Sequence, residues 1–267
     1  MHEGDAQDDR LHALSARSPQ PVVFHPHSAL GEFLGTLILI LLGDGVVAGV
    51  VLDKSKSHHS GWIVITAGWA IAVLCGVFVA NALGAPGELN PAVTIANMMR
   101  GTRTMGDGFA HMAAQMVGAI AGATLVWLHY LPHWVETKDP ASKLACFCNA
   151  PAIRSTGANL MAEVIATFTL VFVAGMIFST AAQGTSAASN LGPVFVGALV
   201  WGIGLSLGGP TGYAINPARD LGPRIAHAIL PIAGKGGSDW GYSWIPVVGP
   251  MLGGAIAAVV IKGVLGA

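Results

Sequence analysis

Charge and cysteine are both scarce in this sequence of 267 residues. Only 10% of the residues are charged, whereas soluble domains are nearer a quarter, and the net charge at pH 7 is −1. A chain so nearly neutral offers no basic surface for nucleic acid and no electrostatic anchor for an anionic membrane surface. Its three cysteines are too few for a disulfide scaffold. These absences exclude nucleic acid as a partner and exclude the small disulfide-rich class of proteins.

Patterns typical of a metal centre or a catalytic site are also lacking. Cys146 and Cys148 form a Cys-x-Cys pair in a polar loop, which leaves a disulfide or a metal site open there. No cluster of His or Cys flanks the pair, however, and no apolar segment shows metal-ligand spacing or a nucleophile–base pattern. We therefore predict no metal, no cofactor and no enzymatic activity.

Hydrophobic residues make up 53% of the chain, and glycine is abundant at 36 residues, which suits helices that pack closely in lipid. A helix needs about 20 apolar residues to cross a bilayer. The sequence contains six apolar stretches of about this length, and they predict an all-α membrane protein. They are Ala29–Leu52, Trp62–Leu83, Gly108–Leu131, Ala158–Thr180, Leu191–Leu207 and Trp244–Leu265.

The first 27 residues differ from the rest. Residues 1–27 are polar and contain several aspartates and prolines, with no apolar segment of the kind that a signal peptide needs. This composition predicts a disordered polar tail. Residues 28–267 are then expected to form a single transmembrane domain.

The triplet Asn-Pro-Ala occurs twice, as Asn90-Pro91-Ala92 and as Asn216-Pro217-Ala218, each after an apolar span. Asn is a strong N-cap and Pro is favoured at the first helical position, so each triplet predicts the start of a helix. Pro91 to Arg100 would make a helix of about 15 Å, which is half of a hydrocarbon core about 30 Å thick. Such half-helices enter the membrane and turn back where protein or a water-filled cavity shields the irregular backbone.

The two halves of the chain look related. The segment GEFLGTLILIL carries Glu32 and the segment AEVIATFTLVF carries Glu163, and each Glu is followed four residues later by Thr. Repeats over about 28–131 and 157–265 would each hold three spans and one half-helix. Because three is odd, the second repeat must be inverted, so the half-helices enter from opposite faces and meet near the mid-plane. Their facing N-termini would favour a hydroxyl oxygen and repel cations.

These motifs resemble the aquaporin, or major intrinsic protein, family. The segment GYAINPARDLGPR is most similar to the aquaglyceroporin (glycerol facilitator) branch, in which an Asp follows the second Asn-Pro-Ala-Arg, here Asp220. The resemblance covers about residues 28–265 and implies six helices, two re-entrant half-helices and a pore through each subunit of a homotetramer. It also implies a multi-pass protein of the plasma or inner membrane with a cytoplasmic N-terminus. The distribution of Lys and Arg does not support that orientation by itself.

The resemblance assigns a selectivity filter to Trp69, Gly204, Tyr213 and Arg219. The fork of donors on Arg219 can hold two adjacent hydroxyls and repels cations. Trp69 and Tyr213 offer apolar faces to the carbon edge of a polyol, and Gly204 leaves room for it. Alternatively, the two aromatics belong to an interfacial belt and Gly204 only packs helices. An arginine in an apolar segment is costly unless it lines an aqueous cavity.

Other charged residues are expected inside the spans. By resemblance, Glu32 and Glu163 accept hydrogen bonds from backbone N–H groups of the re-entrant loops, with snorkelling to the interface as the alternative. Asp220 is expected to pair locally or to cap the half-helix, and Asp44 to face the outer vestibule. Glu88 departs from the family, in which many members have His two residues before the first Asn, and it would put negative charge at the inner mouth.

Together these residues predict a passive channel for glycerol and related small polyols, with some water, that excludes ions and protons. A mainly water-selective channel is one alternative, against which Gly204 and Tyr213 argue. An ion-coupled secondary transporter is another, but coupling needs a titrating relay at the mid-plane, where this chain has only asparagines.

Overall fold

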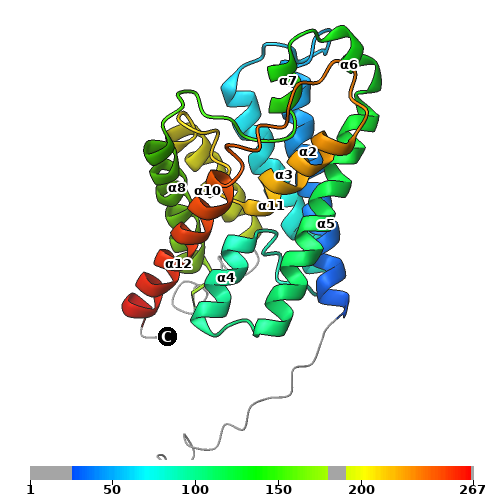
Figure 1. Ribbon diagram of the computed structural model, residues 1–267. Coiled ribbons are helices and arrows are strands. Elements are labelled where there is room, and N and C mark those ends of the chain that lie inside the picture. Colours follow the sequence, from blue (N-terminus) through cyan, green and yellow to red (C-terminus); the bar gives the residue numbers. More distant parts are fainter. Residues whose placement is uncertain (1–25, 180–190, 266–267) are drawn as a thin grey trace, which may run out of the picture.

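A computed structural model describes residues 26–179 and 191–265, and within these ranges the chain is helical with no strand (Figure 1). Five of the described helices are long and apolar enough to cross a membrane, and a sixth, shorter apolar helix accompanies them. The predicted all-α membrane fold is confirmed. The long helices are α2 (Pro26–Val51), α3 (Trp62–Ala82), α5 (Met105–His129), α8 (Thr156–Ile177) and α12 (Ile245–Leu265), and the shorter one is α10 (Gly192–Leu207).

These bounds agree with the predicted spans to within a few residues. The predicted end of the fourth span, Thr180, lies outside the described residues, as does most of the predicted tail. The last two residues of that tail are helical, since α2 already begins at Pro26. Proline is favoured in the first turn of a helix, which explains why the helix starts before the apolar run does.

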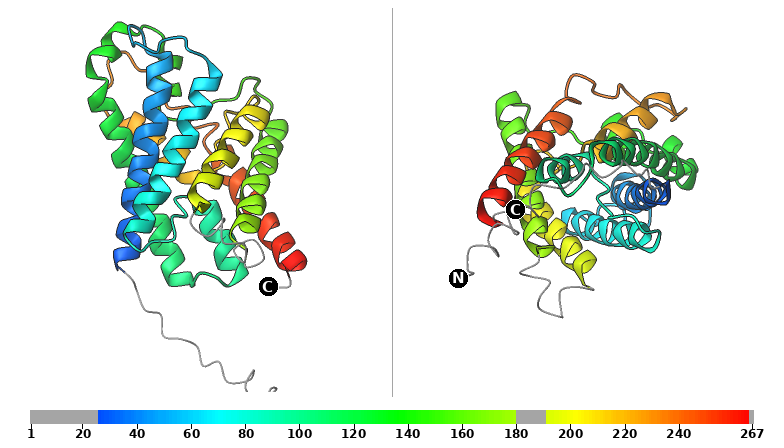
Figure 2. Two further views of the ribbon diagram at one scale, coloured as in Figure 1. Left: turned by 180° about the vertical axis from the view of Figure 1, so that it is seen from behind. Right: turned by 90° about the horizontal axis from the view of Figure 1, so that it is seen from below.

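Two half-helices complete the repeats, α4 (Pro91–Arg100) and α11 (Pro217–Ile229), and each begins at the proline that the sequence indicated. In Figure 1 their proline ends lie near the middle of the molecule, with α4 running toward the lower end and α11 toward the upper end. The first residues of α2 and the last of α12 lie at one end of the bundle (Figures 1 and 2).

The long helices pack mainly within their own half of the chain, whereas each half-helix packs on the other half. In the first half α2 packs against α3 and α5, and in the second α8 packs against α12 and α10. Each half-helix packs on a long helix of the other half, however: α11 on α5 and α4 on α12. Small residues allow this contact, because a β-carbon at Gly254 of α12 would lie only 2.7 Å from the carbonyl oxygen of Ala92 in α4.

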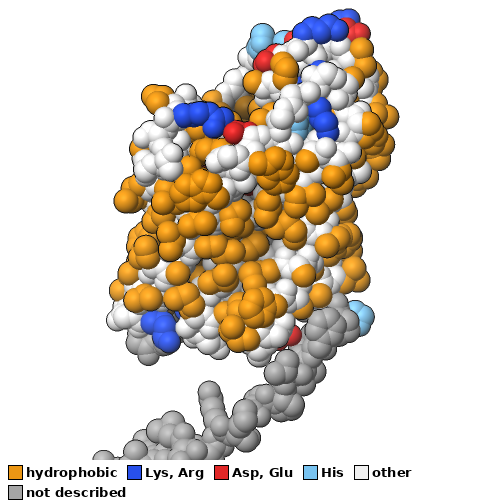
Figure 3. Space-filling view, in the orientation of Figure 1, with side chains coloured by type: hydrophobic (Ala, Val, Ile, Leu, Met, Phe, Trp, Pro, Cys, Tyr) orange, Lys and Arg blue, Asp and Glu red, His pale blue; other side chains and the backbone are white. Residues whose placement is uncertain are grey.

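Two short helices, α6 (Leu131–Glu136) and α7 (Pro140–Ala145), lie at the upper end in Figure 1 and were not predicted. They are too short to show a helical period in the sequence. Figure 3 shows hydrophobic side chains over the middle of one face, with Lys and Arg side chains gathered toward the upper end and one basic group at the lower edge. That apolar band fits a multi-pass membrane protein.

Candidate functional site: a pore between two half-helices

Buried carboxylates hold the backbone of the two loops that precede the half-helices. Glu32 accepts hydrogen bonds from the backbone N–H groups of Glu88 (2.8 Å) and Leu89 (2.7 Å). Glu163 accepts from those of Ala214 (3.0 Å) and Ile215 (2.9 Å). Both glutamates are fully buried, so neither snorkels to an interface. The loops have no strand or helix partner at this depth, and these acceptors satisfy donors that the membrane could not.

The residue before each asparagine has a left-handed backbone. Leu89 has φ 51° and Ile215 has φ 46°, a conformation that costs a residue with a side chain roughly 1–2 kcal/mol. Their carbonyl groups each receive a hydrogen bond from the opposite loop. Asn216 donates its Nδ2 to the oxygen of Leu89 and Asn90 donates its Nδ2 to that of Ile215, both at 2.8 Å. The two loops therefore fix one another.

Each asparagine also caps its own half-helix. Oδ1 of Asn90 accepts from the backbone N–H of Ala92 (2.9 Å), and Oδ1 of Asn216 accepts from those of Ala218 (3.0 Å) and Arg219 (3.2 Å). An amide nitrogen carries two donors, and the bond to the opposite loop uses one. One N–H of each asparagine is thus left for a solute, beside two helix N-termini that carry partial positive charge.

A cavity of about 280 Å³ runs past both asparagines. Its lining includes Arg219 at the start of α11 and Arg100 at the end of α4. Side chains of α3, α8 and α10 give it apolar walls, among them Val77, Val171 and Val200. Loop residues of both re-entrant segments line it as well, so an apolar surface is combined with backbone polar groups.

Three of the four predicted filter residues line this cavity: Trp69, Tyr213 and Arg219. The guanidinium carbon of Arg219 lies 4.1 Å from the centroid of the Trp69 ring, within the range of a cation–π contact. Tyr213 meets Trp62 edge to face, with ring centroids 5.8 Å apart. The sequence gave no reason to assign Trp62 to the filter, because an aromatic residue at the end of a span is typical of the membrane interface.

Gly204 is not among the residues that line the cavity. A β-carbon there would lie 2.8 Å from Cζ of Tyr213 and 2.9 Å from Cγ2 of Thr66. Its carbonyl oxygen accepts a hydrogen bond from Nε1 of Trp62 at 3.0 Å. The space that the missing side chain leaves is therefore taken up by the Tyr213 ring and not by the lumen.

Asp220 and Arg224 form a fully buried ion pair at 2.8 Å, one turn apart on α11. Asp220 also accepts from the backbone N–H of Asn149 (2.7 Å). Arg224 donates to the carbonyl oxygens of Asn149 (2.9 Å) and Ser238 (2.7 Å). This network joins the half-helix to two loops of the upper end. Asp44 is only 1% exposed, so the expectation that it faces an open outer vestibule is wrong.

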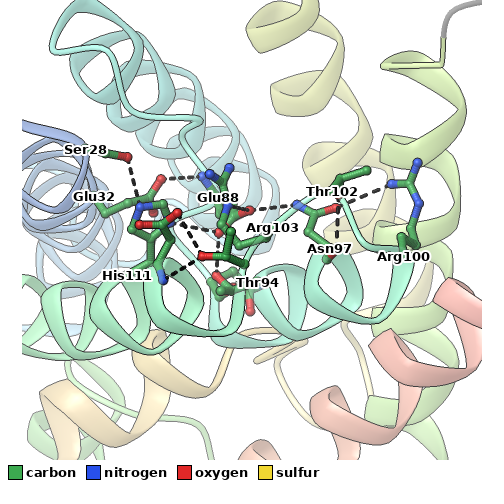
Figure 4. Close-up of polar contacts among 12 residues, drawn as sticks. Ser28, Glu32, Glu88, Thr94, Asn97, Arg100, Thr102, Arg103 and His111 are labelled. Carbon is green, nitrogen blue, oxygen red and sulfur yellow. Dashed lines mark hydrogen bonds and ion pairs between the residues drawn. The ribbon is translucent and has the colours of Figure 1, made fainter. Parts of the chain in front are cut away.

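The side chain of Glu88 is 3% exposed, and Glu88 is one of the residues that line the cavity, so negative charge at the inner mouth stays a prediction. Its carboxylate accepts from Thr94 and Asn97, both at 2.8 Å, and pairs with Arg103 and His111, both at 3.3 Å (Figure 4). The side chain thus ties the first re-entrant loop to α4 and α5. The sequence placed His111 within a mainly apolar segment but gave no sign that it pairs with Glu88.

Glu32, Glu88 and His111 bring potential metal ligands within 4.8 Å of one another. Each carboxylate oxygen of the two glutamates already accepts a hydrogen bond from a loop N–H group or a neighbouring side chain, and His111 also contacts Ser28 at 2.9 Å. The cluster is thus satisfied without an ion. Cys146 and Cys148 are free thiols that contact the carbonyl oxygens of Ser142 and Leu144, which removes the disulfide alternative.

Comparison with known protein families shows to which family this chain belongs. The profile of the major intrinsic protein family matches residues 22–261, which covers both asparagine motifs and all of the apolar helices named above except the last residues of α12. The chain belongs to the major intrinsic protein family.

Individual members of the family are similar over most of their length. A probable glycerol uptake facilitator protein of Thermotoga maritima is 55% identical over 230 residues, covering 86% of this chain and 95% of that protein. Glycerol uptake facilitator protein 3 of Lactiplantibacillus plantarum is 54% identical over 233 residues, covering 87% and 95%. The X-ray structure of the aquaglyceroporin from Plasmodium falciparum aligns with a TM-score of 0.78 and 29% identity, covering 90% of this chain and 96% of that one.

Proposed function

We propose that this protein is a passive channel through which glycerol and related small neutral solutes, with some water, diffuse across a membrane. The observation that carries the proposal is the cavity that is lined by both half-helix N-termini and by Arg219. Its wall combines apolar side chains with backbone polar groups, which suits a solute with one carbon edge and one hydroxylated edge. The names of the bacterial relatives support glycerol as a substrate.

In this proposal Trp69, Tyr213 and Arg219 form the selectivity filter. The Arg219 guanidinium offers hydroxyl groups a fork of donors, and the aromatic faces cover the carbon edge. Gly204 contributes indirectly, because it lets the Tyr213 ring lie back against α10 and so leaves room for a polyol. A mainly water-selective pore is disfavoured by the same geometry.

The two asparagine motifs, Asn90-Pro91-Ala92 and Asn216-Pro217-Ala218, are proposed to form the central constriction. Glu32 and Glu163 support it by holding the loops, and Asp220 by holding α11 to the upper loops. Two helix N-termini and the Arg219 cation disfavour cations and hydrated protons there. Asparagine amides do not titrate, so no proton relay passes this point, which argues against an ion-coupled transporter.

We further propose a homotetramer in the plasma or inner membrane with a cytoplasmic N-terminus. The assembly and the orientation rest on the family resemblance. The exposed apolar side chains along the long helices would then contact either lipid or a neighbouring subunit.

Flux into proteoliposomes of the purified protein tests the proposed function. Glycerol should enter along its gradient at a rate that a proton ionophore does not change and without an electrical current. Liposomes without protein give the background rate. Accumulation of glycerol against its gradient, driven by a pH difference, would rule out a passive channel.

A further inference from the structure

Asp44 is an acidic side chain in the interior of α2 that the proposed mechanism does not yet use. It is 1% exposed, and neither of its carboxylate oxygens has a hydrogen-bond partner among the described residues. A buried polar group without a partner is unfavourable, and a buried carboxylate more so. We therefore expect the carboxylate of Asp44 to be stabilised by an interaction other than an ordinary hydrogen bond.

That interaction is with an arginine of the cavity lining. Nη1 of Arg219 lies 4.0 Å from Oδ1 of Asp44, and Nη1 likewise has no hydrogen-bond partner among the described residues. The guanidinium carbon stands 4.1 Å from the centroid of the Trp69 ring. In the described part of the chain, the guanidinium is thus bounded by an aromatic face and a carboxylate.

Gly43, the residue before Asp44 on α2, packs against the ring of Trp69. A β-carbon at Gly43 would lie 2.2 Å from Cζ3 of Trp69, so only glycine lets the indole ring lie against this turn of the helix. Two consecutive positions of α2 therefore stand behind the filter: Gly43 behind the ring of Trp69 and Asp44 behind the cation of Arg219. Asp44 itself does not line the cavity and does not touch a solute in it.

We propose that Asp44 is a positioning residue that holds the Arg219 guanidinium at the constriction and thereby sets the preference of the pore for glycerol over water. The inference rests on the proposed filter. A guanidinium that is held on one side by the carboxylate presents its other donors to the lumen in a fixed direction. Glycerol needs two of those donors at once, whereas a water molecule needs one, so a loosened guanidinium impairs glycerol more than water.

Replacing Asp44 with Ala removes the carboxylate and should lower glycerol permeability about tenfold while water permeability changes far less. A tenfold change corresponds to about 1.4 kcal/mol. Asp44→Asn keeps an oxygen of the same shape but not the charge. A charge-assisted contact is roughly twice as strong as a neutral one, so Asn should lose about half of that free energy, or about threefold in glycerol permeability.

A double-mutant cycle separates positioning from a general structural role. The glycerol-to-water permeability ratio is measured by stopped-flow light scattering on proteoliposomes of wild type, Asp44→Ala, Arg219→Ala and the double variant. Because Asp44 acts through Arg219, Asp44→Ala should lower the ratio in the wild type and leave it unchanged when Arg219 is already absent. Thr167→Val is the matched control, since Thr167 is a fully buried polar residue of α8 that is not in the cavity lining and whose hydroxyl has no partner among the described residues. It should leave the ratio unchanged.

The outcomes distinguish this inference from the proposed function. If Arg219→Ala leaves the ratio unchanged, the filter itself is wrong. If Arg219→Ala changes the ratio but Asp44→Ala does not, or if the two changes add independently, Asp44 has no positioning role and the proposed channel stands. Where Asp44→Ala yields no folded protein, the same cycle is run with Asp44→Asn, and a ratio equal to that of the wild type overturns the inference.

Discussion

At the scale of single residues, the pore depends on side chains that never touch its lumen. Gly204 makes room for Tyr213, and Glu32 holds the first re-entrant loop from behind the cavity wall. The sequence indicated which of these positions matter but not in which direction their side chains point. Gly204 was expected at the pore wall because the family resemblance assigned it to the filter. Spacing along a chain does not say which neighbour fills the space beside a glycine, since Thr66 and Tyr213 come from other segments.

Gly204→Ala tests this arrangement. The new methyl group would overlap the Tyr213 ring at 2.8 Å and displace it toward the cavity. Overpacking of this kind costs about 1–3 kcal/mol. If that free energy appears in the barrier for a solute that fills the pore, glycerol permeability falls by roughly one to two decades, and water permeability falls less. Stopped-flow light scattering on matched proteoliposomes measures both.

Gly202→Ala is the control, because Gly202 lies on the same helix and a β-carbon there meets nothing within 4 Å. It should leave both permeabilities unchanged. An equal fall of glycerol and water permeability in Gly204→Ala would show that Gly204 only packs helices.

At the scale of the elements, the half-helices were the most predictable part of the chain. Asn before Pro marks a helix start strongly, and α4 and α11 begin where the motifs indicated. The long helices followed from their apolar length, with errors of only a few residues at the ends. Helices α6 and α7 were missed because two turns carry no periodic signal. The Glu88–His111 pair was missed because contacts between distant segments leave no local pattern.

Packing between α12 and α4 should be sensitive to a single methyl group. Gly254→Ala would put a β-carbon 2.7 Å from the carbonyl oxygen of Ala92, which belongs to the first asparagine motif. The clash should lower the melting temperature in detergent and also lower solute flux, because α4 must shift. At Gly263 of the same helix nothing lies within 4 Å of a β-carbon, so Gly263→Ala should be neutral or slightly stabilising. Equal melting temperatures for the two variants would mean that α12 and α4 do not pack this closely.

At the scale of the whole molecule, the exchange of half-helices ties the two halves together. Since α11 packs on α5 and α4 on α12, neither half encloses the cavity alone. The cavity also takes lining residues from both halves, so selectivity belongs to the assembled chain. Oligomeric state and membrane orientation could not be read from the sequence in the same way. Each long helix carries exposed hydrophobic side chains, and on the face that Figure 3 shows, basic side chains lie at both ends.

Labelling from one side of the membrane tests the orientation and the inverted arrangement together. Thr102 is exposed in the loop between α4 and α5, at the end of the bundle where α2 begins, and Lys138 is exposed between α6 and α7 at the opposite end (Figure 1). With a cytoplasmic N-terminus, Lys138→Cys should react with a membrane-impermeant maleimide in intact cells. Thr102→Cys should react only after the cells are permeabilised. Cys146 and Cys148 are buried but Cys75 in α3 is half-buried, so the labelling of the wild-type chain is measured as the background. The reverse pattern would invert the orientation but keep the fold. Reaction of both variants from the same side would contradict the arrangement in which α4 and α11 enter from opposite faces.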